Sequence, residues 1–312
     1  MPASTSTAPG KIILFGEHAV VYGRPAIAVP VRQIQVRVVV SANPRGRPGA
    51  VHVLAPDINL DSWLNELGPE HPLKRAANSI LDELNIGRLP ACTLRITSTI
   101  PIAAGLGSGA AVSVATIRAL AAFLGHPLPD ERVSILAYEV EKIYHGTPSG
   151  IDNTVITYAA PVFFVKGQPI EILEVGSHFT IVIGDTGISS PTKVAVGDLR
   201  KLWLADPHHY ESIFDSAGEI ARKARVCIEN GMIQALGPLM DENQALLEQM
   251  NVSSPDLERL VQAARQAGAV GAKLSGGGRG GNMIALVHPQ HAEQVAKSLL
   301  NAGAVRTLIT TV

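Results

Sequence analysis

The chain has 312 residues, of which 46% are hydrophobic and 17% are charged, a balance typical of folded globular proteins and not of disordered ones. Its 26 lysines and arginines nearly cancel its 27 aspartates and glutamates, so no overall basic charge indicates a nucleic acid or a membrane surface as partner. The length predicts two domains and a sizeable core.

The two cysteines, Cys92 and Cys227, stand too far apart in sequence for a disulfide framework or a zinc knuckle, so we expect two reduced thiols. No apolar run reaches the length that spans a membrane, and the N-terminal MPASTSTAPGK lacks the basic start and apolar core of a signal peptide. These features predict a cytoplasmic protein without membrane association.

Strand and helix patterns alternate in the first half of the chain. Apolar runs and period-two alternation predict strands at 11–15, 26–40, 51–54 (as the return of the preceding strand) and 93–100. Apolar residues at helical spacing predict helices at 72–86, from the glycine-rich turn to Gly125, and at 131–144. A turn-rich segment is expected at 145–153, with strand-like pieces after it in VITYA, PVFFVK and IEIL.

The second half is mostly helical and ends in strands. A strand at 179–187 runs into a turn, helices follow at 192–204, 209–230, 232–250 and 255–267, and glycines cluster at 275–281. The strand NMIALV, a helix and the strand VRTLITTV complete the chain. Strands with segregated helices predict the α+β class, not a doubly wound sheet. We place the domain boundary near residue 175, which gives domains 1–175 and 176–312.

The glycine-rich stretch at 101–111, PIAAGLGSGAA, is the strongest local signal for a ligand. A glycine turn that feeds a helix presents unpaired N–H groups and the positive end of the helix dipole, and Ser108 is a good N-cap residue. This arrangement favours an anion such as phosphate. The alternative interpretation is a place where two backbones pack tightly. Neither a GxxxxGK[ST] nor a GxGxxG pattern is present.

Five other residues are candidates for chemistry. Lys11, Glu17 and His18 cluster beside glycines near the N-terminus, although each could be an ordinary strand-end or core residue. Glu141 falls near the end of a predicted helix and Asp152 lies in the following turn, where surface and capping carboxylates are common. A functional pair would place one carboxylate on a metal and use the other as a proton acceptor.

Three segments match, in order, the motifs of the GHMP kinase superfamily: APGKIILFGEHAVVYG at 8–23, PIAAGLGSGAA at 101–111 and GAKLSGGGRGGNMIAL at 271–286. The chain resembles this superfamily over nearly its full length. GEHAVVYG, EKIYHGTPSGIDN and DTGISSPTK are similar to its mevalonate kinase family. The resemblance implies an N-terminal domain like domain 2 of ribosomal protein S5, a ferredoxin-like C-terminal domain and an active site in the cleft between them. It is compatible with a homodimer.

The resemblance also implies the roles of individual residues. Asp152 would accept the proton of the C5 hydroxyl of mevalonate, and Lys11 would lower its proton affinity and stabilise developing charge. Ser108 and Glu141 would hold Mg²⁺, and Glu17, His18 and Thr192 would hold mevalonate. The ATP phosphates would be bound by the second motif, Pro101, Ile102, Ala103, Ala104, Gly105, Leu106, Gly107, Ser108, Gly109, Ala110 and Ala111.

Two departures from the family pattern matter. The second motif usually reads GLGSSA, and here Gly109 replaces its second serine, which bears on the Mg²⁺ role of Ser108. The third motif usually reads SGAGGGG, and here Gly277 and Arg279 intrude; Arg279 could contact a phosphate, crowd the site or point to solvent. Two alternatives to a mevalonate kinase remain: a sibling kinase for phosphomevalonate or a sugar, and a non-catalytic nucleotide-binding relative. A phosphorylated substrate should need extra cations, and the Glu17 segment offers only Arg24.

Overall fold

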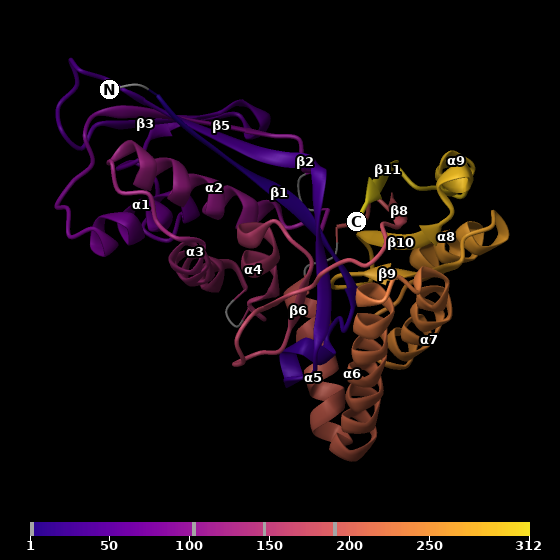
Figure 1. Ribbon diagram of the computed structural model, residues 1–312. Coiled ribbons are helices and arrows are strands. Elements are labelled where there is room, and N and C mark those ends of the chain that lie inside the picture. The colour runs from indigo at the N-terminus through magenta and orange to yellow at the C-terminus, as the bar shows by residue number, and fades with distance from the viewer. Residues whose placement is uncertain (1–2, 102–103, 146–147, 190–191) are drawn as a thin grey trace. The chain divides into compact units, whose positions relative to one another are not determined.

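The computed structural model describes residues 3–101, 104–145, 148–189 and 192–312 (Figure 1). Its contacts divide the chain into two compact units. Unit 1 comprises Met1–Gly10, Val31–Ile102 and Gly107–Ala159, and unit 2 comprises Lys11–Pro30, Ala103–Leu106 and Ala160–Val312. Two long strands, β1 (Ser4–Phe15) and β2 (Ala26–Ala42), contribute residues to both units. The division into 1–175 and 176–312 stays a prediction about the family's two domains.

The strands of unit 1 pair in the order β4-β3-β5-β2, and β1 also pairs with β2. Their bounds are β3 Val51–Ala55, β4 Leu60–Trp63 and β5 Cys92–Ser98. Cys92 pairs with Ala42 of β2 on one side and with Val51 of β3 on the other. The expectation that 51–54 returns along 26–40 was therefore wrong, because β5 lies between the two strands. The short strand β4 was not predicted.

Four helices of unit 1 pack on one another, and Figure 1 shows α1, α2 and α3 on one side of its strands. Their bounds are α1 Pro72–Glu83, α2 Ser108–Phe123, α3 Asp130–His145 and α4 Ile151–Tyr158. Helix α2 packs against the other three, and its alanines leave room for close packing. Gly125, with φ 81°, follows its end as predicted.

Helix α4 corrects the prediction that 145–153 is irregular throughout and that VITYA is strand-like. Gly150 starts this helix with φ 94°, a backbone angle that glycine adopts without strain. Ile151, Val155 and Ile156 of α4 are buried, and Asn153 Nδ2 donates to the carbonyl oxygen of Ser134 on α3 at 3.1 Å. Packing against α2 and α3 therefore overrides the strand preference of the β-branched residues.

Unit 2 contains an antiparallel sheet in the order β11-β8-β10-β9. Its strands are β8 Thr180–Asp185, β9 Gly271–Ser275, β10 Asn282–Val287 and β11 Arg306–Thr311. The short strands β6 Val162–Phe164 and β7 Glu171–Ile172 extend the pairing from β2. The helices are α5 Thr192–Ala205, α6 Pro207–Glu229, α7 Leu236–Gln249, α8 Pro255–Gln266 and α9 Ala292–Asn301.

Strand β9 was not predicted, and its position at the sheet edge has a specific support. It pairs with β10 on one side, and on the other its N–H groups donate to side chains of α7. Ala272 N donates to Asp241 Oδ1 at 3.1 Å and Leu274 N donates to Gln244 Oε1 at 2.8 Å. The side chains of α7 therefore satisfy backbone groups that an exposed edge would leave open. Strands with segregated helices confirm the predicted α+β class. Among the described residues, no helix combines the length and apolar character that crossing a bilayer requires.

Candidate active site

The N-terminus of α2 has the features of an anion site. Gly107 is the N-cap residue with φ 79°, and as a glycine it has no side chain to accept from the first N–H groups. The predicted N-cap, Ser108, is instead the first residue of the helix, and its side chain is half-exposed. Because the first N–H groups of a helix have no partner within it, a helix that begins after a glycine can offer them to a ligand. The helix dipole favours a negative charge at the same place.

Glu141 approaches this helix end from α3. Its side chain is buried, and a Cβ added to Gly109 would lie 3.4 Å from Glu141 Oε1. The carboxylate therefore lies against the first turn of α2, where a phosphate is expected. Mg²⁺ prefers few carboxylates together with phosphate oxygens, so Glu141 fits such an ion. Among the described residues, no group of three or more His, Cys, Asp and Glu side chains could hold a metal ion without such a ligand.

Gly109 is expected to weaken α2. It is exposed and lies in the first turn of the helix, and the space above it accepts a Cβ at ordinary contact distance from Glu141. Because glycine loses more backbone entropy than alanine on folding, we expect Gly109→Ala to raise the free energy of unfolding by about 0.5–1 kcal/mol. Urea unfolding checks this. Gly107→Ala is the control and should destabilise, since its φ of 79° strains any side chain.

Asp152 lies in the first turn of α4, directly after Ile151, and is half-buried. Helix α4 packs on both α2 and α3. Ser108, Glu141 and Asp152 therefore come from three helices that pack on one another within unit 1. The sequence predicted all three residues, but not that Asp152 is fixed at the start of a helix.

Residues 104–106, at the start of the glycine turn, belong to unit 2 and contact other residues of that unit. The buried side chain of Asn282, at the start of β10, donates to the carbonyl oxygen of Ala104. The N–H of Lys11 donates to the carbonyl oxygen of Leu106 at 3.0 Å, and the Lys11 side chain is buried. Residues 104–106 are thus held by the first and third motifs. Ile102 and Ala103, which were predicted to bind ATP, lie outside the described residues.

The first and third motifs are joined by three contacts within unit 2. Ile13 N donates to Ser275 Oγ at 3.1 Å, and Ser275 Oγ donates to the carbonyl oxygen of Ile13 at 2.9 Å. The Lys273 ammonium forms an ion pair with Glu17. His18 Nε2 lies 3.1 Å from the carbonyl oxygen of Gly277. Lys273, Ser275 and Gly277, which are alternate residues of the third motif, therefore contact the first motif. Lys273 and Ser275 lie on β9, where every second side chain points to the same face.

His18 is held in an unusual backbone conformation, with φ 60° and ψ −49°. Its ring is buried, and burial lowers the pKa of His18 to about 4. The ring is therefore neutral at pH 7. Because a carbonyl oxygen can only accept, Nε2 carries the proton and donates to Gly277, which leaves Nδ1 as an acceptor.

The low pKa of His18 predicts a loss of stability in acid. In the unfolded chain histidine takes up a proton near pH 6.5, whereas folded His18 takes it up only near pH 4, so the unfolded state binds more protons between these values. The contribution of His18 should therefore lower the free energy of unfolding by about 3 kcal/mol as the pH falls from 6.5 to 4. We expect unfolding of His18→Asn to be less sensitive to pH in this window. Equal pH slopes for the two proteins would show that His18 is protonated normally.

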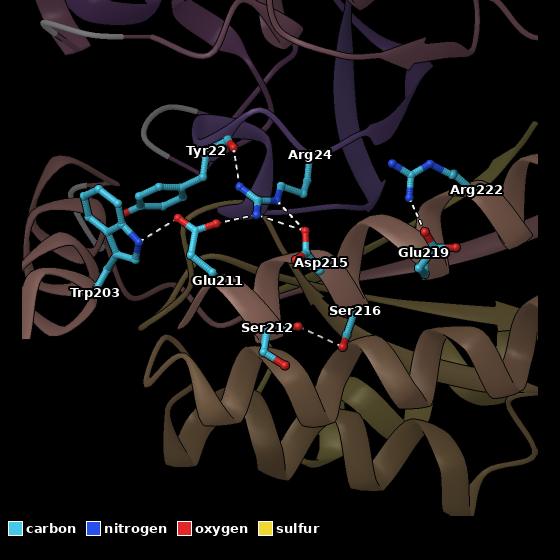
Figure 2. Close-up of polar contacts among 9 residues, drawn as sticks. All are labelled: Tyr22, Arg24, Trp203, Glu211, Ser212, Asp215, Ser216, Glu219 and Arg222. Atoms are coloured by element: carbon cyan, nitrogen blue, oxygen red, sulfur yellow. Dashed lines mark hydrogen bonds and ion pairs between the residues drawn. The ribbon is translucent and has the colours of Figure 1, made fainter. Parts of the chain in front are cut away.

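Arg24 fixes the end of the segment that carries Glu17 and His18. Its guanidinium donates to Asp215 Oδ1 at 3.0 Å, to Glu211 and to the carbonyl oxygen of Tyr22 at 2.8 Å (Figure 2). Trp203 Nε1 donates to the other oxygen of Glu211 at 2.9 Å. The charge of Arg24 is thus compensated by two carboxylates of α6, so this residue is a poor candidate for binding a substrate phosphate.

Arg279, at the tip of the third motif, contacts neighbouring residues of unit 2. Its guanidinium forms an ion pair with Asp198 of α5 at 2.7 Å and donates to the carbonyl oxygen of Asn251 at 3.2 Å. Arg279 therefore ties the glycine loop to neighbouring elements of unit 2 and does not simply point to solvent. Thr192, predicted to hold substrate, is the first residue of α5, and its side chain is outside the described part of the structure.

Lys273 is the residue that the sequence analysis missed. It is fully buried in the middle of β9. One sequence feature could have identified it: Lys273 stands inside the apolar run GAKLS of the third motif. A lysine in a buried strand needs a partner, because lysine is rarely buried unless it is paired.

A groove of about 960 Å³ runs along α6 and α7 of unit 2. Its lining includes Glu211, Asp215, Glu219 and Glu242. Figure 2 shows three of these carboxylates along α6. Carboxylates repel phosphate groups, so this groove is not the candidate nucleotide site.

Comparison with known proteins agrees with these motifs. The family model described as the GHMP kinases N terminal domain matches residues 71–160, and that of the GHMP kinases C terminal matches residues 224–305. A mevalonate kinase of Thermococcus sibiricus is 37% identical over 96% of this chain and 93% of its own length. The crystal structure of L. major mevalonate kinase in complex with R-mevalonate has a TM-score of 0.83 and 31% identity, covering 99% of this chain and 95% of that one. The Methanococcus jannaschii mevalonate kinase has a TM-score of 0.84 and 27% identity, covering 99% and 98%.

Proposed function

Because this chain belongs to the mevalonate kinase family of the GHMP kinase superfamily, we propose that it transfers the γ-phosphoryl group of ATP to the C5 hydroxyl of (R)-mevalonate. The products are 5-phosphomevalonate and ADP. The observation that carries the phosphoryl-transfer part is the N-terminus of α2, which begins after Gly107, with the buried carboxylate of Glu141 beside Gly109. The identity of the acceptor is supported by relatives named mevalonate kinase that match nearly the whole chain.

The triphosphate binds, in this proposal, at residues 101–111 through the N–H groups of the first turn of α2. Glu141 and Ser108 would hold Mg²⁺, which would supply positive charge to the phosphate oxygens when bound. The fit of Glu141 supports this role, because its carboxylate already lies against the helix end. Ser108 is the weaker ligand candidate, since its side chain is only half-buried and Gly109 removes the second hydroxyl of the usual motif.

The proton of the C5 hydroxyl passes to the carboxylate of Asp152 as the oxygen attacks the γ-phosphorus. Asp152 suits this role because its position is fixed at the start of α4. Lys11 lowers the proton affinity of Asp152, the proton acceptor. It also stabilises the negative charge of the transferred phosphoryl group. Its burial supports this role, since a charge acts more strongly away from water.

In this proposal mevalonate is held by Glu17, His18 and Thr192. The compensated charge of Arg24 argues against a phosphorylated acceptor, which should need a cation that is not already paired. Cytoplasmic localisation and a homodimer also remain proposals. Sedimentation or light scattering of the purified chain tests the second of these.

A coupled ADP-release assay with Mg-ATP tests the proposed reaction. Mevalonate, 5-phosphomevalonate, galactose and homoserine are offered separately. We expect turnover with mevalonate alone. Turnover with another acceptor would leave the phosphate site in place and overturn the proposed substrate. ATP binding without turnover of any acceptor would favour a non-catalytic nucleotide-binding protein.

A further inference from the structure

The ion pair between Lys273 and Glu17 is placed where charges are seldom found. Both side chains have 0% exposure, so neither charge is solvated by water. The Lys273 ammonium also donates to the carbonyl oxygen of Leu274 at 2.6 Å. Burial raises the pKa of Glu17 and lowers the pKa of Lys273, and the attraction between the two groups opposes both shifts. Each group therefore depends on the other to remain charged.

Glu17 uses only part of its carboxylate in this pair. Oε1 accepts from Lys273, whereas Oε2 is buried and has no hydrogen-bond partner among the described residues. A buried acceptor without a partner is costly, and in native proteins it usually marks a missing ligand or water. As the ionised partner of Lys273, Glu17 carries no proton on Oε2. It can only accept.

His18 repeats this arrangement on the next residue. The carbonyl of Gly277 takes its Nε2 proton, and Nδ1 is buried without a partner among the described residues. The third motif thus occupies one polar atom of Glu17 and one of His18, and leaves an acceptor open on each. Two consecutive side chains with open acceptors suit a group that donates a hydrogen bond, such as a hydroxyl.

We propose that Lys273 is a positioning residue that occupies Oε1 of Glu17 and directs Oε2 to accept a hydrogen bond from a hydroxyl group of the substrate. This inference rests on the proposed function. In mevalonate the C5 hydroxyl gives its proton to Asp152, and the carboxylate has no proton to donate at pH 7. The remaining donor is the C3 hydroxyl, which is therefore the group that Glu17 recognises.

The rigidity of β9 makes Lys273 suitable for this task. Its two neighbours in the strand are tied to α7, Ala272 by Asp241 and Leu274 by Gln244. Gly271 lies so close to Gly237 of α7 that a Cβ on it would meet the Gly237 carbonyl oxygen at 2.3 Å. The strand cannot shift without losing these contacts, so the ammonium of Lys273 has a fixed position relative to α7.

The test compares two acceptors, mevalonate and 5-hydroxy-3-methylpentanoate, which lacks only the C3 hydroxyl. The ratio of their kcat/KM values is measured for the wild type, Lys273→Met and Lys273→Arg. We expect the wild type to prefer mevalonate by about 100-fold or more, because the analogue leaves Oε2 unpaired. Lys273→Met should reduce this preference at least tenfold, and Lys273→Arg, which keeps the positive charge, should retain more of it.

A purely structural role for Lys273 gives a different result. In that case Lys273→Met lowers kcat/KM equally for both acceptors, and the unchanged ratio overturns the proposal. The exposed Lys201, which pairs with Asp198 on α5, provides the control Lys201→Met, for which both kcat/KM values should stay as in the wild type.

A second variant protects the test against misfolding of Lys273→Met. Glu17→Gln keeps the shape of the side chain, and when its amide oxygen accepts from Lys273 an NH₂ donor takes the place of Oε2. Its preference for mevalonate should also fall at least tenfold, and an unchanged preference overturns the proposal. Failure of the proposed function can be told apart from failure of this inference about Lys273. If the proposed function were wrong, the wild type would turn over neither acceptor.

Discussion

Replacing Asp152 by asparagine is expected to lower kcat by about 10²–10⁴-fold, because the amide keeps the size of the side chain and cannot take the proton of the attacking hydroxyl. The KM for ATP should change little, since the proposed triphosphate site is the N-terminus of α2 and does not include Asp152. Steady-state kinetics with Mg-ATP and mevalonate measure both quantities. Asp152 is half-buried in the first turn of α4, so its replacement should leave the fold intact.

Glu131→Gln is the matched control for Asp152→Asn. Glu131 also lies in the first turn of a helix of unit 1, and it is exposed. Both variants remove one carboxylate from a helix N-terminus and so lose a similar dipole interaction. Only Asp152→Asn should lose turnover. If its kcat stayed within tenfold of the wild type, Asp152 would not be the proton acceptor.

Removing Lys273 is expected to cause the largest loss of stability. Lys273→Met takes the ammonium away from a carboxylate that has no exposure to water, and breaking a buried ion pair in this way costs about 3–5 kcal/mol. Urea unfolding followed by circular dichroism measures the difference. Lys201→Met should leave the free energy of unfolding almost unchanged, because its ion pair with Asp198 is exposed.

The double variant Glu17→Gln, Lys273→Met separates the loss of charge from the loss of packing. With both charges gone, no isolated ion remains in the interior, so we expect the double variant to be more stable than Lys273→Met alone. A double variant that is no more stable than Lys273→Met would show that the cost comes from packing and not from the stranded carboxylate.

The sequence located most elements because their patterns are local. The alternation in 26–40, the helical spacing in 72–86 and the glycine that ends α2 each appear where they were predicted. Helix α4 was missed because β-branched residues in VITYA favour strands, and only packing on α2 and α3 makes them helical. Strand β9 was missed because a glycine at its start and a central lysine obscure its short pattern, although pairing with β10 and the side chains of α7 stabilise it.

The sequence by itself determined the family and the candidate residues, because three ordered motifs carry these in the chemical identity of consecutive side chains. Only the tertiary structure decided what those side chains contact. It placed Glu141 against Gly109, compensated the charge of Arg24 and tied Arg279 to Asp198. It also paired Glu17 with Lys273, which lies 256 positions away in the sequence. No local pattern contains such a contact, because it depends on which strand packs beside which segment after the chain has folded.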